Sequence, residues 1–135
     1  MNKQEKAEMY LPYLRDHGYE PEIDKDGDII FKKEKGRYYI LVYEDDDEYF
    51  QLAYPNFWQI ADDDARERAL EVCTQVNRST KVAKLYVTRK GNEVWASAEL
   101  LLPRPQDFEG VFKRAMSVLQ TGATKFLEEI AKPAE

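Results

Sequence analysis

The C-terminal part of the chain carries the feature that most limits its fold, a long helical stripe of apolar and small residues. Between Gln106 and Ala131 such residues recur every three or four positions. They are Phe108, Val111, Phe112, Ala115, Leu119, Gly122, Ala123, Phe126 and Ile130. At about 1.5 Å per residue this helix is roughly 39 Å long, enough to cross a whole small sheet.

Strand patterns fill the first half of the chain. Four strands are expected, at Tyr19–Asp24, Asp28–Lys33, Arg37–Glu44 and Tyr49–Tyr54. Asp26-Gly27 predicts a two-residue hairpin turn in which both residues have positive φ, and Gly36 marks the next turn. The run Tyr38–Tyr43 is apolar on both faces, which predicts a central strand covered on both sides. Pro55 is expected to end the fourth strand.

Two more helices complete the pattern. The first lies within Lys3–His17, with Gly18 as its C-terminal cap. Pro12 indicates either a kink or a shorter helix that begins near it. The second runs about Ala65–Arg78, with Asp64 at capping-box spacing from a glutamate.

The element order predicts the fold class. Strands at Val82–Thr88 and Glu93–Leu102 flank a hairpin loop between the last two helices. The order α-β-β-β-β-α-β-β-α predicts an α+β fold in which a curled antiparallel sheet packs against helices. Residues 1–135 are predicted to form one domain, with a frayed tail at Lys132–Glu135.

Charge and cysteine content exclude several classes of protein. The net charge is −6, and an acidic chain without a basic stripe repels phosphate backbones, so nucleic-acid binding is not expected. Cys73 is the single cysteine, which excludes an internal disulfide and fits a reducing compartment. The sequence shows no secretory signal and no apolar run of about 18 residues, so we expect a cytoplasmic protein that does not span a membrane.

Clusters of acidic residues have local structural explanations. Asp24, Asp26 and Asp28 alternate as calcium ligands do, but a calcium loop needs glycine at its sixth position, and here Gly27 is fourth. The run Glu44–Glu48 is interpreted as a solvated turn, and Asp62–Asp64 as carboxylates at a helix N-terminus. No metal or cofactor is therefore predicted.

No residue pattern indicates a catalytic site. The only histidine, His17, lies at a helix end, and Cys73 lies within an apolar helical stripe, where a buried structural thiol is expected. Motifs for phosphate loops, dinucleotide binding and nucleophile elbows are absent from the sequence. The prediction is a non-enzymatic protein; acid–base chemistry by carboxylates stays as an alternative.

Three large apolar residues suggest a contact surface. Phe57, Trp58 and Ile60 follow Pro55 and are expected outside regular structure. Such residues must be covered by the core of the chain or by a partner, and both explanations are kept.

Several sequence blocks, taken in their order, form a pattern typical of one known family. The blocks, within residues 10–127, are Gly18–Asp24, Asp26–Ile29, Phe31-Lys32, Tyr49–Leu52, Tyr54–Trp58, Lys81–Val87 and Pro105–Phe112. Their order resembles the YbjN-type family, described as bacterial regulators of sensory transduction. The family is grouped by fold with type III secretion chaperones, small acidic proteins that usually dimerise and hold unfolded stretches of secreted partners. The resemblance implies no catalytic residue. It implies a homodimer, with candidate contacts on the strand Val82–Thr88 and on the helical residues Ala69, Val72, Cys73 and Val76.

Together these observations predict a protein-binding module. We expect a chaperone-like protein or regulatory adaptor that binds a polypeptide through its sheet face or through the region of Phe57 and Trp58. The alternative is a regulator of signalling or stress response that binds a small ligand between the sheet and the long last helix.

Overall fold

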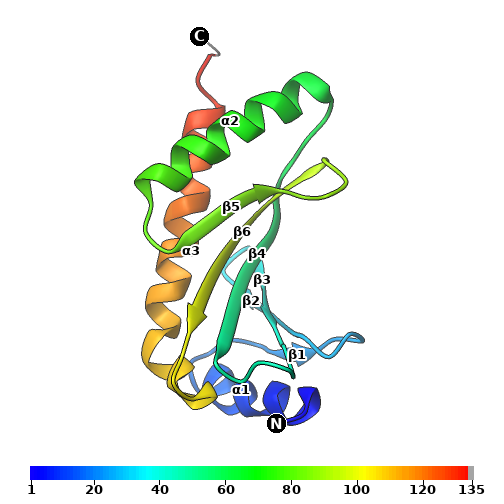
Figure 1. Cartoon of the computed structure of the whole chain (residues 1–135), viewed down its shortest axis with the longest axis vertical. Coiled ribbons are helices and arrows are strands. Elements are labelled where there is room, and N and C mark those ends of the chain that lie inside the picture. The colour runs from blue at the N-terminus through cyan, green and yellow to red at the C-terminus, as the bar shows by residue number, and fades with distance from the viewer. Residues whose placement is uncertain (134–135) are drawn as a thin grey trace.

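Residues 1–133 are described by a computed structural model, shown in Figure 1. Its helices are α1 (Lys3–Asp16), α2 (Asp63–Ser79), the short 3-10 helix η1 (Pro105–Asp107) and α3 (Phe108–Ile130). Its strands are β1 (Glu22–Ile23), β2 (Ile29–Lys33), β3 (Gly36–Leu41), β4 (Tyr49–Gln59), β5 (Ala83–Val87) and β6 (Glu93–Leu101). The predicted α+β class and element order are confirmed; the last two residues of the expected tail lie outside the described part.

The strands form one antiparallel sheet in the order β1-β2-β3-β4-β6-β5. Figure 1 shows α3 running along one side of the curled sheet, with α2 crossing near β5 and α1 at the opposite end. Phe112 of α3 meets Phe31 of β2 at 5.7 Å between ring centroids, and Phe126 is fully buried. Gly122 lets α3 approach β5 closely, because a Cβ there would lie 3.0 Å from a methyl group of Leu85. The long apolar stripe therefore forms one side of the core.

Local capping signals define α1. The Asn2 side chain accepts a hydrogen bond from the Glu5 N–H, and the Glu5 carboxylate accepts one from the Asn2 N–H, so the helix begins at Lys3. Gly18 has φ +83°, and its N–H donates to the carbonyl of Arg15 at 3.2 Å, which confirms the predicted glycine cap. Pro12 is inside α1 on an exposed position, so the shorter helix beginning near it is ruled out.

The Asp-Gly hairpin differs from the predicted two-residue turn. Only Gly27 has positive φ, at +84°, and its N–H donates to the Asp24 carbonyl at 3.0 Å. Asp24 also accepts hydrogen bonds from the backbones of Asp26 and Asp28 through its carboxylate. The loop is thus a longer turn built around an aspartate, and β1 keeps only two paired residues.

Strand β4 continues through Pro55, contrary to the prediction. Its pairing with β6 shifts register between Tyr54 and Trp58, and Asn56 within this irregularity has φ +43°. Proline is tolerated at such a bulge because its nitrogen is not needed for the ladder. Phe57 and Trp58 therefore lie in a strand and not in a loop.

Two further predictions need correction. Helix α2 is capped by Asp62, whose carboxylate accepts from the Ala65 N–H at 2.8 Å, and not by Asp64. Strand β3 is central in the sheet order but is covered on one face only. Tyr38 and Ile40 are buried at 3% and 0% exposure, whereas Tyr39 is on the opposite face and half-buried.

Candidate functional site

The face of the sheet opposite the core carries aromatic and polar side chains on neighbouring strands. We call it the open face. Strand alternation and register assign it Ile30, Tyr39, Leu41, Tyr43, Tyr49, Gln51, Ala53, Lys84, Tyr86, Trp95, Ser97, Glu99 and Leu101. The helices α2 and α3 pack on the other face (Figure 1). Tyr10 of α1 also contacts the core side, with its ring 4.7 Å from Phe108.

Aromatic rings cluster at two places on the open face. Tyr39 of β3 stacks on Trp95 of β6 with centroids 6.3 Å apart, and Tyr86 of the edge strand β5 lies 6.5 Å from Trp95. Tyr43, just after β3, and Tyr49 of β4 meet edge to face at 5.0 Å. The rings come from different parts of the sheet, so its register sets their position.

A buried polar pair lies beneath these rings. Gln51 is 7% exposed and Ser97 is 0% exposed, although both are on the open face. The Gln51 Nε2 donates to Ser97 Oγ at 2.9 Å, and the Tyr43 hydroxyl donates to Gln51 Oε1 at 2.7 Å. Burial of an amide without partners would be costly, so these hydrogen bonds keep the Gln51 side chain in one orientation and hold the Tyr43 ring above it.

Glu99 extends this network to the edge strand. Its carboxylate lies 2.5 Å from the Lys84 ammonium and accepts a hydrogen bond from the Tyr49 hydroxyl. Burial alone would raise the pKa of Glu99, but the hydrogen bonds from Lys84 and Tyr49 outweigh it and leave this pKa below its ordinary value. Burial and the bond to Glu99 raise the pKa of Tyr49, so its hydroxyl remains a donor.

The open face is therefore a set of aromatic rings, of which Tyr43 and Tyr49 are held by hydrogen bonds to Gln51 and Glu99. Leu101, at its end, is 77% exposed, and Tyr43 is 38% exposed. Tyrosine and tryptophan supply large contact areas with few rotatable bonds, and they are enriched at protein interfaces. Such a surface suits contact with another polypeptide.

The three apolar residues that follow Pro55, which were predicted to contact a partner, are largely covered by the chain itself. The rings of Phe57 and Trp58 are 5.5 Å and 5.6 Å from that of Phe126, and both residues are half-buried. Ile60 is 7% exposed. Of the two explanations kept above, cover by the chain's own core accounts for most of their surface; contact with a partner stays a prediction.

The residues suggested for dimer contact are also enclosed by this chain. Ala69, Val72, Cys73 and Val76 of α2 are between 0% and 5% exposed. At the free edge of β5, Asn77 donates to the Leu85 carbonyl at 3.0 Å and accepts from the Leu85 N–H at 2.8 Å. This side chain occupies the backbone groups to which an added strand would bond. A dimer through α2 and β5 stays a prediction, and it would need these contacts to open.

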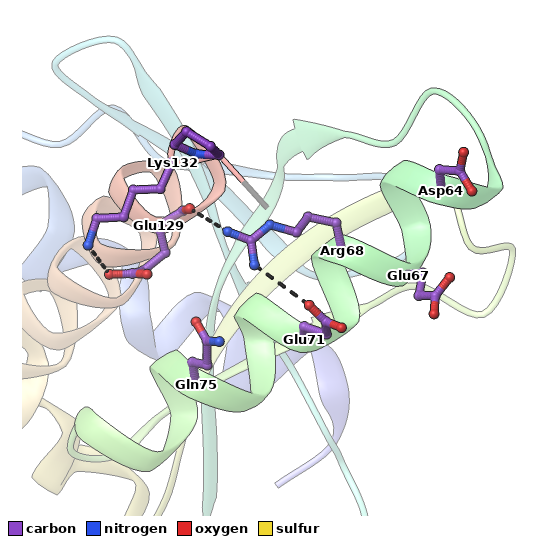
Figure 2. A pocket seen from close by; sticks show the side chains of 8 residues that line it. Asp64, Glu67, Arg68, Glu71, Gln75, Glu129 and Lys132 are labelled. Carbon is purple, nitrogen blue, oxygen red and sulfur yellow. Dashed lines mark hydrogen bonds and ion pairs between the residues drawn. The ribbon is translucent and has the colours of Figure 1, made fainter. Parts of the chain in front are cut away.

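A polar groove lies between α2 and the end of α3 (Figure 2). Its volume is about 430 Å³, and it is lined by Asp64, Glu67, Arg68, Glu71, Gln75, Glu129, Lys132 and Pro133. Arg68 points across it and donates to the backbone carbonyl of Glu129 at 3.0 Å. That carbonyl is in the last turn of α3 and also accepts from the Lys132 N–H at 3.1 Å, so Arg68 adds a second hydrogen bond at the helix end and has a structural role.

The two nucleophile candidates are on different helices. His17, at the end of α1, is exposed and stacks on Tyr13 at 4.0 Å. Cys73, on α2, is buried, and burial raises the pKa of its thiol to about 11. Within residues 1–133, no three Cys, His, Asp or Glu side chains gather in an arrangement that could hold a metal ion. None of the helices in that range is long and apolar enough to cross a membrane.

The acidic run Glu44–Glu48 is more than the solvated turn that was expected. Its backbone surrounds the buried Lys6 of α1, whose ammonium donates to the carbonyl of Asp46 at 2.8 Å. The N-terminal amine lies 3.3 Å from Asp47, and the Lys3 N–H donates to Glu44 at 3.1 Å. This loop therefore holds α1 in place.

A sheet face was predicted to bind a polypeptide, but sequence patterns did not identify its residues. Tyr39 and Tyr43 belong to the apolar run Tyr38–Tyr43, which indicated a strand covered on both faces. The polar residues Gln51, Ser97 and Glu99, alternating with apolar ones, were the available signal for a face left open.

Most of the sequence matches a known protein family. Residues 7–129 match the YbjN family model, described as "Putative bacterial sensory transduction regulator". No curated protein matches the chain.

Proposed function

The chain belongs to the YbjN family, and we propose that it is a non-catalytic regulator that binds a polypeptide partner in the cytoplasm through the open face. The observation that carries this proposal is the aromatic face, in which Gln51 and Glu99 hold the rings of Tyr43 and Tyr49 by hydrogen bonds and the other rings pack on one another. In this role the protein acts as an adaptor or in a chaperone-like way. A second copy of the chain is one candidate partner.

Three physical properties support binding at this face. The rings of Tyr39, Tyr86 and Trp95 are already positioned by their packing on one another. Binding of a partner therefore costs less side-chain conformational entropy in this protein. Leu101 adds an exposed apolar side chain that gains burial on contact. The Lys84–Glu99 ion pair contributes polar groups at the rim, as protein interfaces commonly have.

In the core between the centre of the sheet and the last helix, the packing does not favour the alternative of a small ligand buried there. Side chains fill that space, including Phe31, Phe112 and Leu119, which are 0–1% exposed. The region of Phe57 and Trp58 is likewise packed on α3. The open face is therefore the better candidate surface.

The experiment is an affinity pull-down from lysate of the native host, read by mass spectrometry. Wild-type protein is compared with Leu101→Asp, which places a charge on the open face. The matched control is Leu127→Asp, because Leu127 is also exposed, at 43%, but lies on α3. We expect one polypeptide to be recovered by the wild type and by Leu127→Asp and to be lost with Leu101→Asp.

A second variant measures the strength of the contact. Tyr39→Ala removes a ring stacked on Trp95, and such truncations at interface centres commonly cost about 2 kcal/mol or more, roughly thirtyfold in Kd. Isothermal titration calorimetry with the recovered partner gives this number. Equal affinity of wild type, Leu101→Asp and Tyr39→Ala would refute binding through the open face.

A further inference from the structure

A second surface, on the helix side of the sheet, combines apolar lining with positive charge. It is a groove of about 320 Å³ between the start of β5 and the first half of α3. Its lining residues are Lys81, Val82, Leu100, Gly110, Val111, Arg114, Ala115 and Val118. Ala115 is buried, whereas Val82 is 53% exposed, and a Cβ at Gly110 would meet open space.

Val82 holds a strained backbone at the rim of this groove. It has φ +67°, and the Ala83 N–H donates to the Lys81 carbonyl at 2.6 Å, which closes a γ-turn. A β-branched residue rarely adopts positive φ. Strain of this kind persists where the surrounding structure imposes it, and it is concentrated at binding and switch regions.

The groove continues into a second one that is cationic. This neighbour, of about 440 Å³, shares Lys81, Arg114 and Val118 with the first and extends along α3 to Lys125. Lys81, Arg114 and Lys125 are the charged residues that line the two grooves. Among residues 1–133, no carboxylate forms an ion pair with any of the three. The Lys125 ammonium donates to the Ser79 carbonyl at 3.5 Å, which leaves its charge unneutralised. Positive charge without ion-pair partners is thus gathered on a chain whose net charge is −6.

We propose that the two grooves together dock an acidic polypeptide segment. Apolar side chains of the segment enter between Val82, Val111 and Val118, where their burial supplies affinity. Its aspartate and glutamate side chains pair with Lys81, Arg114 and Lys125, which sets orientation and speeds association. A nucleic acid fits less well, because the acidic protein as a whole repels a phosphate backbone.

This docking site is distinct from the open face, since Leu100 lines the groove and the next residue, Leu101, is on the opposite side of the sheet. The two surfaces can therefore be tested separately. Arg114→Glu reverses charge in the groove, Lys81→Glu is a second reversal at its rim, and Leu101→Asp is the control on the open face.

The experiment selects a random-peptide library displayed on phage against the wild-type full-length chain. We expect the enriched peptides to carry Asp or Glu around large aliphatic or aromatic residues. Fluorescence anisotropy with these peptides should show binding weakened at least about tenfold by Arg114→Glu and by Lys81→Glu, and unchanged by Leu101→Asp. Circular dichroism verifies that each variant is folded.

Several results would overturn the proposal. They are the enrichment of no peptide, the enrichment of peptides without excess negative charge, and equal affinity for wild type and both groove variants. Loss of peptide binding in Leu101→Asp alone would assign the peptides to the open face. Sedimentation velocity and flotation with phosphatidylglycerol vesicles test other occupants. Dimerisation or vesicle binding that Arg114→Glu abolishes, without such peptides, would assign the groove to a second copy or to lipid.

Discussion

Replacement of Lys6 by methionine tests how the N-terminal helix is held on the sheet. Lys6 is 0% exposed, and its ammonium donates to the backbone carbonyls of Tyr43 at 2.9 Å, Asp46 at 2.8 Å and Tyr49 at 3.2 Å. Methionine keeps a stem of similar length in the same space but removes all three donors. The loop between β3 and β4 then keeps only its exposed contacts with the N-terminal segment, those of Asp47 with the Met1 amine and of Glu44 with the Lys3 N–H.

The expected loss of stability follows from these contacts. Hydrogen bonds to a charged group contribute about 1.5–3 kcal/mol each, and a buried acceptor that loses its donor costs about 1–3 kcal/mol. Burial lowers the pKa of Lys6, against the opposing charges of Asp47, Asp46 and Asp45, so desolvation already offsets part of the gain. With three carbonyls that lose their donor, we take about 1 kcal/mol for each, a decrease of about 3 kcal/mol in the free energy of unfolding.

The assay is urea unfolding at neutral pH, followed by circular dichroism and tryptophan fluorescence. Lys3→Met is the matched control, because Lys3 is on the same helix but forms a partly exposed ion pair with Asp28 at 3.4 Å. That pair contributes at most about 1 kcal/mol. If Lys6→Met costs no more than Lys3→Met, with unchanged dependence on urea concentration, the reasoning about the buried ammonium is wrong.

Three more perturbations have defined outcomes. Burial raises the pKa of the Cys73 thiol from 9.0 to about 11, so the folded state retains this proton longer and stability falls as pH rises between these values. Urea unfolding across that pH range should show that the free energy of unfolding falls by about 2–3 kcal/mol less in Cys73→Ala than in the wild type. Asn77→Ala leaves the Leu85 backbone groups without partners; we expect about 1–3 kcal/mol lower stability and self-association visible by light scattering. Val82→Gly removes backbone strain and should raise the free energy of unfolding by about 1 kcal/mol in thermal unfolding; a lower melting temperature would contradict the strain.

Local patterns were sufficient for the elements of this fold. The apolar stripe of α3, the cap at Gly18 and the apolar face of α2 each depend on residues close together in sequence, and the structure confirms all three. The element order followed from these signals and from turn residues between strands. Short-range physics decides helix and strand identity, so the sequence is informative at this level.

Predictions failed where residues outside the dipeptide that was read decide the outcome. Pro55 has the local chemistry of a strand end, yet β4 continues because β6 accommodates a register shift beside it. The Asp-Gly turn gained length because the Asp24 carboxylate captured two backbone N–H groups. In both cases a competing set of hydrogen bonds overrode the usual preference of the dipeptide.

The sequence by itself determined the α+β class, the order of elements and the residues that form the core stripes, because these depend on periodicity. Only the tertiary structure decided which side of the sheet α2 and α3 cover and therefore which tyrosines remain outside the core. Tyr38 and Tyr39 are adjacent and chemically identical, but one is 3% exposed in the core and the other belongs to the open face. The physical reason is that the pleat places them on opposite sides, while the helices, fixed by long-range packing, can cover just one of these sides.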